Sequence, residues 1–124
     1  MGYRSEVVLL MSKEVTPYFL TFLAANPESR TLCESSTRFS EGAEGWVIRW
    51  SDIKWYSSDQ GVQGIGDFVS DLESGDLSDY GDTEEGIEWS DHYKFIRVGE
   101  NCDDIVCLGG GYWNVYPATS IAGL

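Results

Sequence analysis

The sequence predicts a single α+β domain over residues 1–124, with a mainly antiparallel sheet of four to five strands and two helices on one face. Three observations lead to this fold class. A chain of 124 residues suits one core. A hydrophobic content of 42% and an aromatic content of 14% exclude a disordered chain. Strand-like and helix-like patterns then alternate in a βαββαβ (ferredoxin-like) order, without an internal repeat.

The first strand and the first helix are predicted from the opening residues. Residues 3–11 are β-prone and contain the continuous apolar run 7–10, which suits a central strand covered on both faces. A short helix is expected to begin at Thr16–Pro17, because proline at the first helical position loses no hydrogen bond. Its apolar stripe is expected to end at Asn26–Pro27.

The stretch that follows is polar and then becomes strongly β-prone. Residues 28–45 contain glycine and polar residues, with weak strand candidates at 31–33 and 37–39 around a turn. Residues 45–56 alternate aromatic and β-branched residues, with an interruption at 51–52. This pattern predicts either one long strand with a bulge or a tight hairpin.

A second amphipathic helix is predicted over about residues 60–73, where apolar residues recur at helical spacing after a helix-start cluster. Gly61, Gly64 and Gly66 each weaken a helix by up to about 1 kcal/mol relative to alanine. Such a helix therefore needs tertiary packing, or its glycines allow another backbone to approach closely.

The last third of the chain is predicted to contain an acidic loop, a hairpin and a tail. Residues 74–91 form the loop, with a short strand expected at 86–89. Residues 92–98 predict a strand, and residues 105–108 return as its antiparallel partner. The tail, residues 112–124, is uncharged and aromatic, so it is expected to pack onto the body.

Acidic residues are concentrated in one part of the chain. Residues 59–104 hold fourteen of the twenty-one acidic residues and two of the eight basic ones, and the formal net charge is −13. Such a charge repels phosphate backbones and anionic lipids, so direct binding to nucleic acid or to a membrane is not expected. No apolar run approaches the length of a membrane span, and cytoplasmic localisation is expected. A charge-driven partner should be basic.

The chain lacks the signatures of common catalytic and metal sites, so neither a catalytic residue nor a cofactor is predicted. His92 is the single histidine, and Cys33, Cys102 and Cys107 include no CxxC pair, which argues against zinc. Buried free thiols are the main expectation, and pairing of Cys102 with Cys107 in an oxidising setting is an alternative.

Two hydrolytic or metal-binding alternatives stay open at the level of sequence. Asp76, Asp79 and Asp82 recur at every third residue and could collect oxygen ligands for Ca²⁺, although the spacing is not that of an EF-hand loop. A carboxylate pair suited to hydrolysis is nearly guaranteed among so many acids and therefore indicates little.

The segment 74–91, with seven acids and no base, has two interpretations. It is either a solvated loop that keeps the protein soluble or a surface that competes with nucleic acid. Duplex DNA presents about one charge per 1.7 Å of its axis, and carboxylates on a folded scaffold can imitate that spacing. Interleaved aromatic residues favour an interface. The predicted partner-binding residues are Asp76, Asp79, Tyr80, Asp82, Glu84, Glu85, Glu88, Trp89 and Asp91.

Short sequence blocks, distributed over most of the chain, resemble those of known proteins. They are MGYRSEV at residues 1–7, WSDIKWY at residues 50–56, and FIRVGE at residues 95–100 with DDI at residues 103–105. These blocks resemble a group of small uncharacterised acidic proteins found in bacteriophage genomes. The resemblance implies the cytoplasm of a bacterial host as the setting. Small acidic phage proteins are often inhibitors of host machinery, including anti-CRISPR proteins, some of which are similar to DNA mimics.

The expected function is therefore that of a non-enzymatic inhibitor. Its acidic surface would block a basic groove of a host protein or ribonucleoprotein, such as a CRISPR defence complex. The alternative is a structural or assembly protein that forms a homo-oligomer through its aromatic tail, for which Trp113 and Tyr116 are the candidates. In that case the acids serve solubility only.

Overall fold

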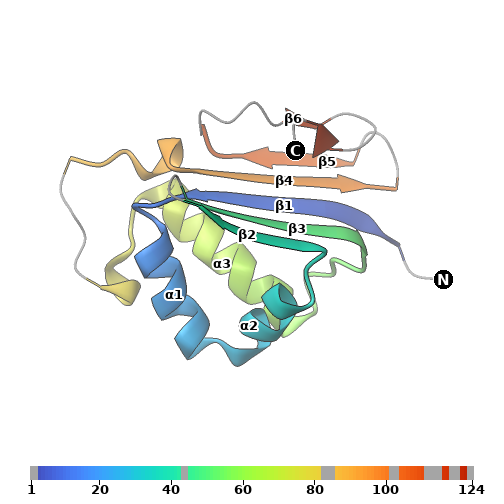
Figure 1. The fold of residues 1–124 in the computed structure, drawn as a ribbon, viewed down its shortest axis with the longest axis horizontal. Coiled ribbons are helices and arrows are strands. Elements are labelled where there is room, and N and C mark those ends of the chain that lie inside the picture. The colour runs from blue at the N-terminus through green and yellow to red at the C-terminus, as the bar shows by residue number, and fades with distance from the viewer. Residues whose placement is uncertain are drawn as a thin grey trace.

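The computed structural model describes residues 3–42, 45–81, 86–100, 104–110, 116–117 and 121–122. Strand β1 (Ser5–Ser12) is the middle strand of a five-stranded sheet of order β2-β3-β1-β4-β5, in which all neighbours are antiparallel (Figure 1). The other strands of this sheet are β2 (Arg38–Gly42), β3 (Gly45–Ile53), β4 (Tyr93–Gly99) and β5 (Ile105–Leu108). The helices are α1 (Thr16–Ala25), α2 (Pro27–Glu34) and α3 (Gln60–Ser74), with short 3₁₀ helices η1 (Ser78–Tyr80) and η2 (Trp89–Asp91). The predicted α+β class with an antiparallel sheet is confirmed.

The prediction of two helices was wrong, because three α-helices lie within the described residues. Asn26 leaves the helical conformation, with φ −130° and ψ 80°, and ends α1 as expected. Pro27 then begins a second helix immediately, since its fixed φ suits a first helical position. The weak strand predicted at 31–33 is therefore part of α2, whereas the candidate at 37–39 leads into β2.

Both faces of β1 are buried, as the apolar run predicted. Its residues from Val7 to Met11 are all 0% exposed. The side chains of Val7, Leu9 and Met11 belong to the main core together with the helices, while Val8 and Leu10 belong to a smaller cluster on the other face. Strand β1 therefore contributes side chains to the apolar clusters on both faces of the sheet.

The second face of the sheet holds the smaller apolar cluster. Val8 and Leu10 pack there with Ile96 and Val98. Strands β6 (Tyr116–Pro117) and β7 (Ile121–Ala122) form a separate two-stranded sheet that lies near β1, β4 and β5. For these four residues, the prediction that the tail lies against the body is confirmed.

Strand β3 is one long strand with an irregularity, and the alternative of a tight hairpin was wrong. Ser5 is opposite Ile53, but Val7 is opposite Trp50, so the register shifts between the two pairs. Asp52 has a positive φ of 54° at this point. Such a bulge bends the strand and changes the direction in which the chain leaves it. The chain then reaches Trp55, which packs back against Trp50.

Helix α3 agrees with the prediction. The carboxylate of Asp59 accepts hydrogen bonds from the backbone N–H groups of Gly61 and Val62 and caps the N-terminus. Gly75 ends the helix in the left-handed conformation, with φ 78°. At Gly61, a Cβ would lie 2.8 Å from the carbonyl oxygen of Glu28, so α2 and α3 approach closely where glycine permits it.

The hairpin of β4 and β5 is confirmed, whereas the strand predicted at 86–89 was wrong. Residues 86–88 have no regular structure, and Trp89 begins η2 instead. Trp89 is 3% exposed, and its ring lies edge-on to that of Tyr18, with the ring centroids 5.2 Å apart. Burial of this ring draws the backbone into a turn that a strand would not make.

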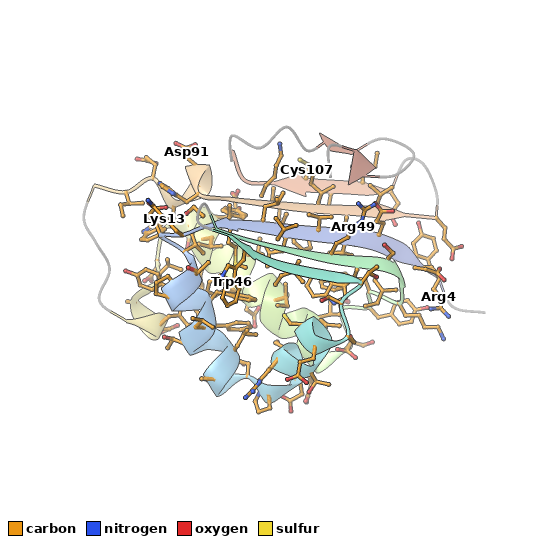
Figure 2. The ribbon with its side chains drawn as sticks, viewed as in Figure 1. Arg4, Lys13, Trp46, Arg49, Asp91 and Cys107 are labelled. Carbon is orange, nitrogen blue, oxygen red and sulfur yellow. The ribbon has the colours of Figure 1, made fainter. Side chains whose placement is uncertain are left out.

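The described cysteines differ in their environments. Cys33 is buried and Cys107 is exposed, and both are free. The expectation of buried thiols is confirmed for Cys33, and burial raises its pKa to about 12. It was wrong for Cys107, which lies on the edge strand β5 (Figure 2). Cys102, the proposed partner of Cys107, lies outside the described residues.

Candidate functional site

The predicted partner-binding residues lie in three different environments. Asp76, Asp79, Glu88 and Asp91 are exposed carboxylates, which suits a surface that meets a basic partner. Tyr80 is half-buried and Trp89 is buried. The remaining three, Asp82, Glu84 and Glu85, lie outside the described residues. Asp91 lies at the same end of the sheet as Lys13, and Arg4 lies at the opposite end (Figure 2).

The two predicted aromatic residues hold the acidic segment on the body. Tyr80 packs on Phe22 and Phe68, with ring centroids 6.0 and 5.1 Å away. Trp89 packs on Tyr18. In this conformation, these rings contribute to the core and connect the loop to α1 and α3, so the exposed carboxylates are the groups that the segment offers to a partner.

Two further carboxylates beside this segment were missed from the sequence. The Tyr80 hydroxyl donates to Oδ2 of Asp71 at 2.7 Å, and the Tyr93 hydroxyl donates to Oε1 of Glu73 at 2.6 Å. Burial raises the pKa of both tyrosines, and the hydrogen bonds to the carboxylates raise it further. Both hydroxyls therefore stay protonated and orient the acids. Sequence spacing could not have shown these pairs, because their partners are 9 and 20 residues apart.

These acids lie where the backbone of α3 is already negative. Asp71 and Glu73 are in the last turn of α3, which contains no basic residue, and Asp76 follows the C-cap residue Gly75. The C-terminal end of a helix carries a partial negative charge, so carboxylates there are unfavourable for the helix. We call the exposed or half-exposed carboxylates of Asp71, Glu73, Asp76, Asp79, Glu88 and Asp91 the acidic surface.

Asp76 shows that part of this surface is ordered as well as charged. Its Oδ1 accepts hydrogen bonds from the hydroxyl of Ser78 at 2.6 Å and from the Ser78 backbone N–H at 3.1 Å. These bonds hold the pKa of Asp76 below its usual value. The carboxylate is therefore ionised and fixed in direction near neutral pH, which suits recognition of a cation.

The surroundings of His92 do not form a catalytic relay. Its Nδ1 lies 3.0 Å from Oγ of Ser12 and 3.5 Å from Oε2 of Glu14. A serine–histidine–acid relay needs the hydroxyl and the acid on different ring nitrogens, whereas both groups here meet the same one. Ser12 is also 0% exposed, so its hydroxyl is closed to a substrate. The cluster joins the end of β1 to the start of β4, as does the 2.9 Å bond from the Ser12 N–H to the His92 carbonyl.

A groove beside α3 is the second feature that the sequence did not indicate. It has a volume of about 500 Å³. We call it the α3 groove, and its lining residues are Tyr3, Trp55, Ser57, Val62, Gln63, Gly66, Asp67, Phe95, Arg97 and Asp104. They come from α3, β4 and three loops, so only the tertiary structure brings them together.

An ion pair lies in the wall of the α3 groove. Both terminal nitrogens of Arg97 donate to the carboxylate of Asp104, at 3.1 and 2.9 Å. The hydroxyl of Tyr3 donates to the same carboxylate at 2.8 Å. The hydrogen bonds from Arg97 and then from Tyr3 hold the pKa of Asp104 below its usual value.

Replacing Asp104 with asparagine should change how stability depends on pH. A carboxyl whose pKa is lowered by folding stabilises the protein above its unfolded pKa of about 3.9, and this contribution is lost as pH falls through the lower folded pKa. We therefore expect the variant to lose less stability than the wild type on acidification below about pH 4. Denaturant unfolding across this range measures the difference. Arg97→Gln should act in the same direction, and identical pH profiles for all three proteins would contradict the prediction.

No family model matches the chain, and neither the curated proteins nor the solved structures include a significant match to it. Within the described parts of the chain, no three or more His, Cys, Asp or Glu side chains are grouped so that they could hold a metal ion. No helix there has the length and apolar character required to cross a membrane.

Proposed function

We propose that the protein is a non-enzymatic inhibitor whose acidic surface occupies the basic nucleic-acid-binding groove of a host protein or ribonucleoprotein. The observation that carries this proposal is the position of Asp71, Glu73 and Asp76 at the negative end of α3, without a basic residue in its last turn. Their charge is unfavourable for the helix itself. Besides the hydrogen bonds that these carboxylates accept within the fold, they stay exposed or half-exposed and can meet a basic partner.

The charge pattern supports a partner that normally holds a polyanion. Residues 74–91 contain seven acids and no base, so no opposite charge within the segment offsets them. A basic groove built for phosphates would attract such a surface over a distance, and association would be fast at low salt. The setting that follows from the resemblance is the cytoplasm of a phage-infected bacterium, with a CRISPR complex as one such target.

Neutralising the acidic segment should weaken association strongly. In a variant with Asp79→Asn, Asp82→Asn, Glu84→Gln and Glu85→Gln, we expect affinity for the partner to fall at least about tenfold at low salt. The partner is first captured from bacterial lysate on the immobilised protein at low and at high salt and identified by mass spectrometry. Affinity is then measured with the purified partner.

A control pair separates position from net charge. Glu28→Gln with Glu34→Gln removes two exposed acids from α2, which meets α3 at Gly61, at the other end of that helix from Asp71 and Glu73. It should have a smaller effect per charge removed than the fourfold variant. Thermal melting checks that every variant is folded. Unchanged affinity in the fourfold variant, or capture that does not depend on salt, would reject the proposal.

The alternative of an oligomeric assembly protein is favoured by a different observation. The edge strand β5 presents Ile105 and Leu108, which are 40% and 37% exposed. An exposed apolar edge strand can pair with another chain. The tail, in contrast, has its described residues β6 and β7 near the protein's own sheet, which gives them a role within the fold.

We also propose a ferredoxin-like arrangement for the first four strands. Its support is the order β2-β3-β1-β4 with antiparallel neighbours, with α1 and α2 between β1 and β2 and with α3 between β3 and β4. In this description α1 and α2 together take the place of the first helix, and β5 is added at the edge.

A further inference from the structure

We propose that the α3 groove binds the guanidinium group of an arginine side chain presented by the basic partner. This inference rests on the proposed function, since it names a residue type by which the same partner is recognised. Three properties of the groove carry it: a fixed aromatic wall, the balance of charge, and an opening at Gly66.

The aromatic wall is provided by Trp55, which is half-buried. Its ring centroid lies 5.0 Å from that of Trp50 and 6.2 Å from that of Phe95, and both of these residues are buried. Contact with two core rings holds the indole in place without covering it completely. Tryptophan is the best aromatic partner of a cation, and arginine is the cation that most often takes this position. A ring that is already fixed loses little entropy when it binds.

The charge of the α3 groove favours a cation over an anion. Among the described residues that line it, Arg97 is the only basic one, and its terminal nitrogens are engaged by Asp104 in two hydrogen bonds. An anionic ligand would have to compete with that carboxylate. Asp67, on the helix side of the groove, is an exposed carboxylate that remains to accept from a guanidinium. The net charge of −13 also favours a cation over an anion.

The third property is the opening at Gly66. Packing within the described chain does not explain why this position is a glycine. Glycine in the interior of a helix is less favourable than alanine. At Gly61 a side chain would collide with α2, and at Gly64 it would collide with Ser29, but a Cβ at Gly66 would meet nothing within 4 Å. Gly66 lines the groove and is exposed. The missing side chain leaves the groove open to a ligand.

Titration with a capped single amino acid tests this site directly. The probe is N-acetyl-arginine amide, and the readout is the NMR shift of the Trp55 indole N–H in the full-length protein. We expect saturable binding with a dissociation constant on the order of millimolar. The neutral isostere N-acetyl-citrulline amide should bind at least about tenfold more weakly, since it keeps the shape of the side chain without its charge. Absence of a saturable Trp55 shift, or equal binding of the two probes, would overturn the assignment.

Two variants locate the binding in the groove. Gly66→Leu fills the opening, and Asp67→Asn removes the exposed carboxylate. Both positions are exposed on α3, so melting temperature should not fall. Each variant should weaken binding of capped arginine, Gly66→Leu by at least about tenfold. Unchanged binding in Gly66→Leu would show that the probe binds elsewhere and would reject the groove.

The fourfold variant in the acidic segment separates this inference from the proposed function. It should lose the captured partner but still bind capped arginine. Of its four residues only Asp79 lies in the described part of the chain, and Asp79 does not line the groove. If the wild type captures a basic partner in a salt-dependent manner and capped arginine does not bind, the groove assignment alone is wrong. If capped arginine binds and no salt-dependent partner is captured, the groove stands and the proposed function fails.

Discussion

Replacing Trp89 with alanine is expected to lower the free energy of unfolding by about 3–5 kcal/mol, the range for removal of a large buried aromatic side chain. Trp89 is 3% exposed and packs against Tyr18 and the ring of His92. Its removal would leave a cavity between η2 and α1 and would loosen the end of the acidic segment. Urea unfolding followed by circular dichroism measures the loss.

The controls for Trp89 distinguish a core residue from an interface residue. Trp89→Phe keeps an aromatic ring in the cavity and should cost clearly less. Glu88→Gln changes the exposed neighbour and should stay within about 0.5 kcal/mol of the wild type. If Trp89→Ala unfolds at the same denaturant concentration as the wild type but no longer binds the partner, then the indole is an interface anchor. Its burial in the free protein then does not contribute to stability.

The glycines of α3 should respond to alanine in opposite directions. Gly61→Ala is expected to lower the free energy of unfolding by about 1–3 kcal/mol, because the new Cβ would lie 2.8 Å from the backbone oxygen of Glu28 and α2 would have to move. Gly66→Ala is expected to raise it by up to about 1 kcal/mol, because the space there is open and alanine favours a helix. Denaturant unfolding of both variants gives the comparison.

Gly64 is a useful third position in this series. An alanine there would collide with the side-chain oxygen of Ser29, which is buried and donates to the carbonyl of Gly61 at 3.0 Å. Adding Ser29→Ala to Gly64→Ala should therefore relieve part of the loss, although it removes that hydrogen bond. A destabilised Gly66→Ala, or a Gly61→Ala as stable as the wild type, would contradict this account of how α2 and α3 pack.

For the candidate sites, charge could be predicted from sequence but position could not. The acidic segment is evident from composition alone, because seven acids occur there without a base. That Asp71 and Glu73 are held by Tyr80 and Tyr93 depends on side chains brought together by folding. The α3 groove has no sequence signal, since Tyr3, Trp55 and Arg97 lie in separate segments that meet only when the sheet has formed and α3 packs onto it.

The sequence by itself determined the elements whose local pattern agrees with their final environment. Burial in α3 repeats with the helical period, whereas the continuous apolar run of β1 matches a strand that is buried on both faces. The tertiary structure was needed to determine the elements whose sequence is compatible with more than one local conformation. Pro27 could end one helix or begin another, and it begins α2 because the close contact with α3 at Gly61 stabilises that helix. A short strand was expected around Trp89 from the sequence, whereas in the fold its ring is buried against Tyr18 and the chain forms the 3₁₀ turn η2 there.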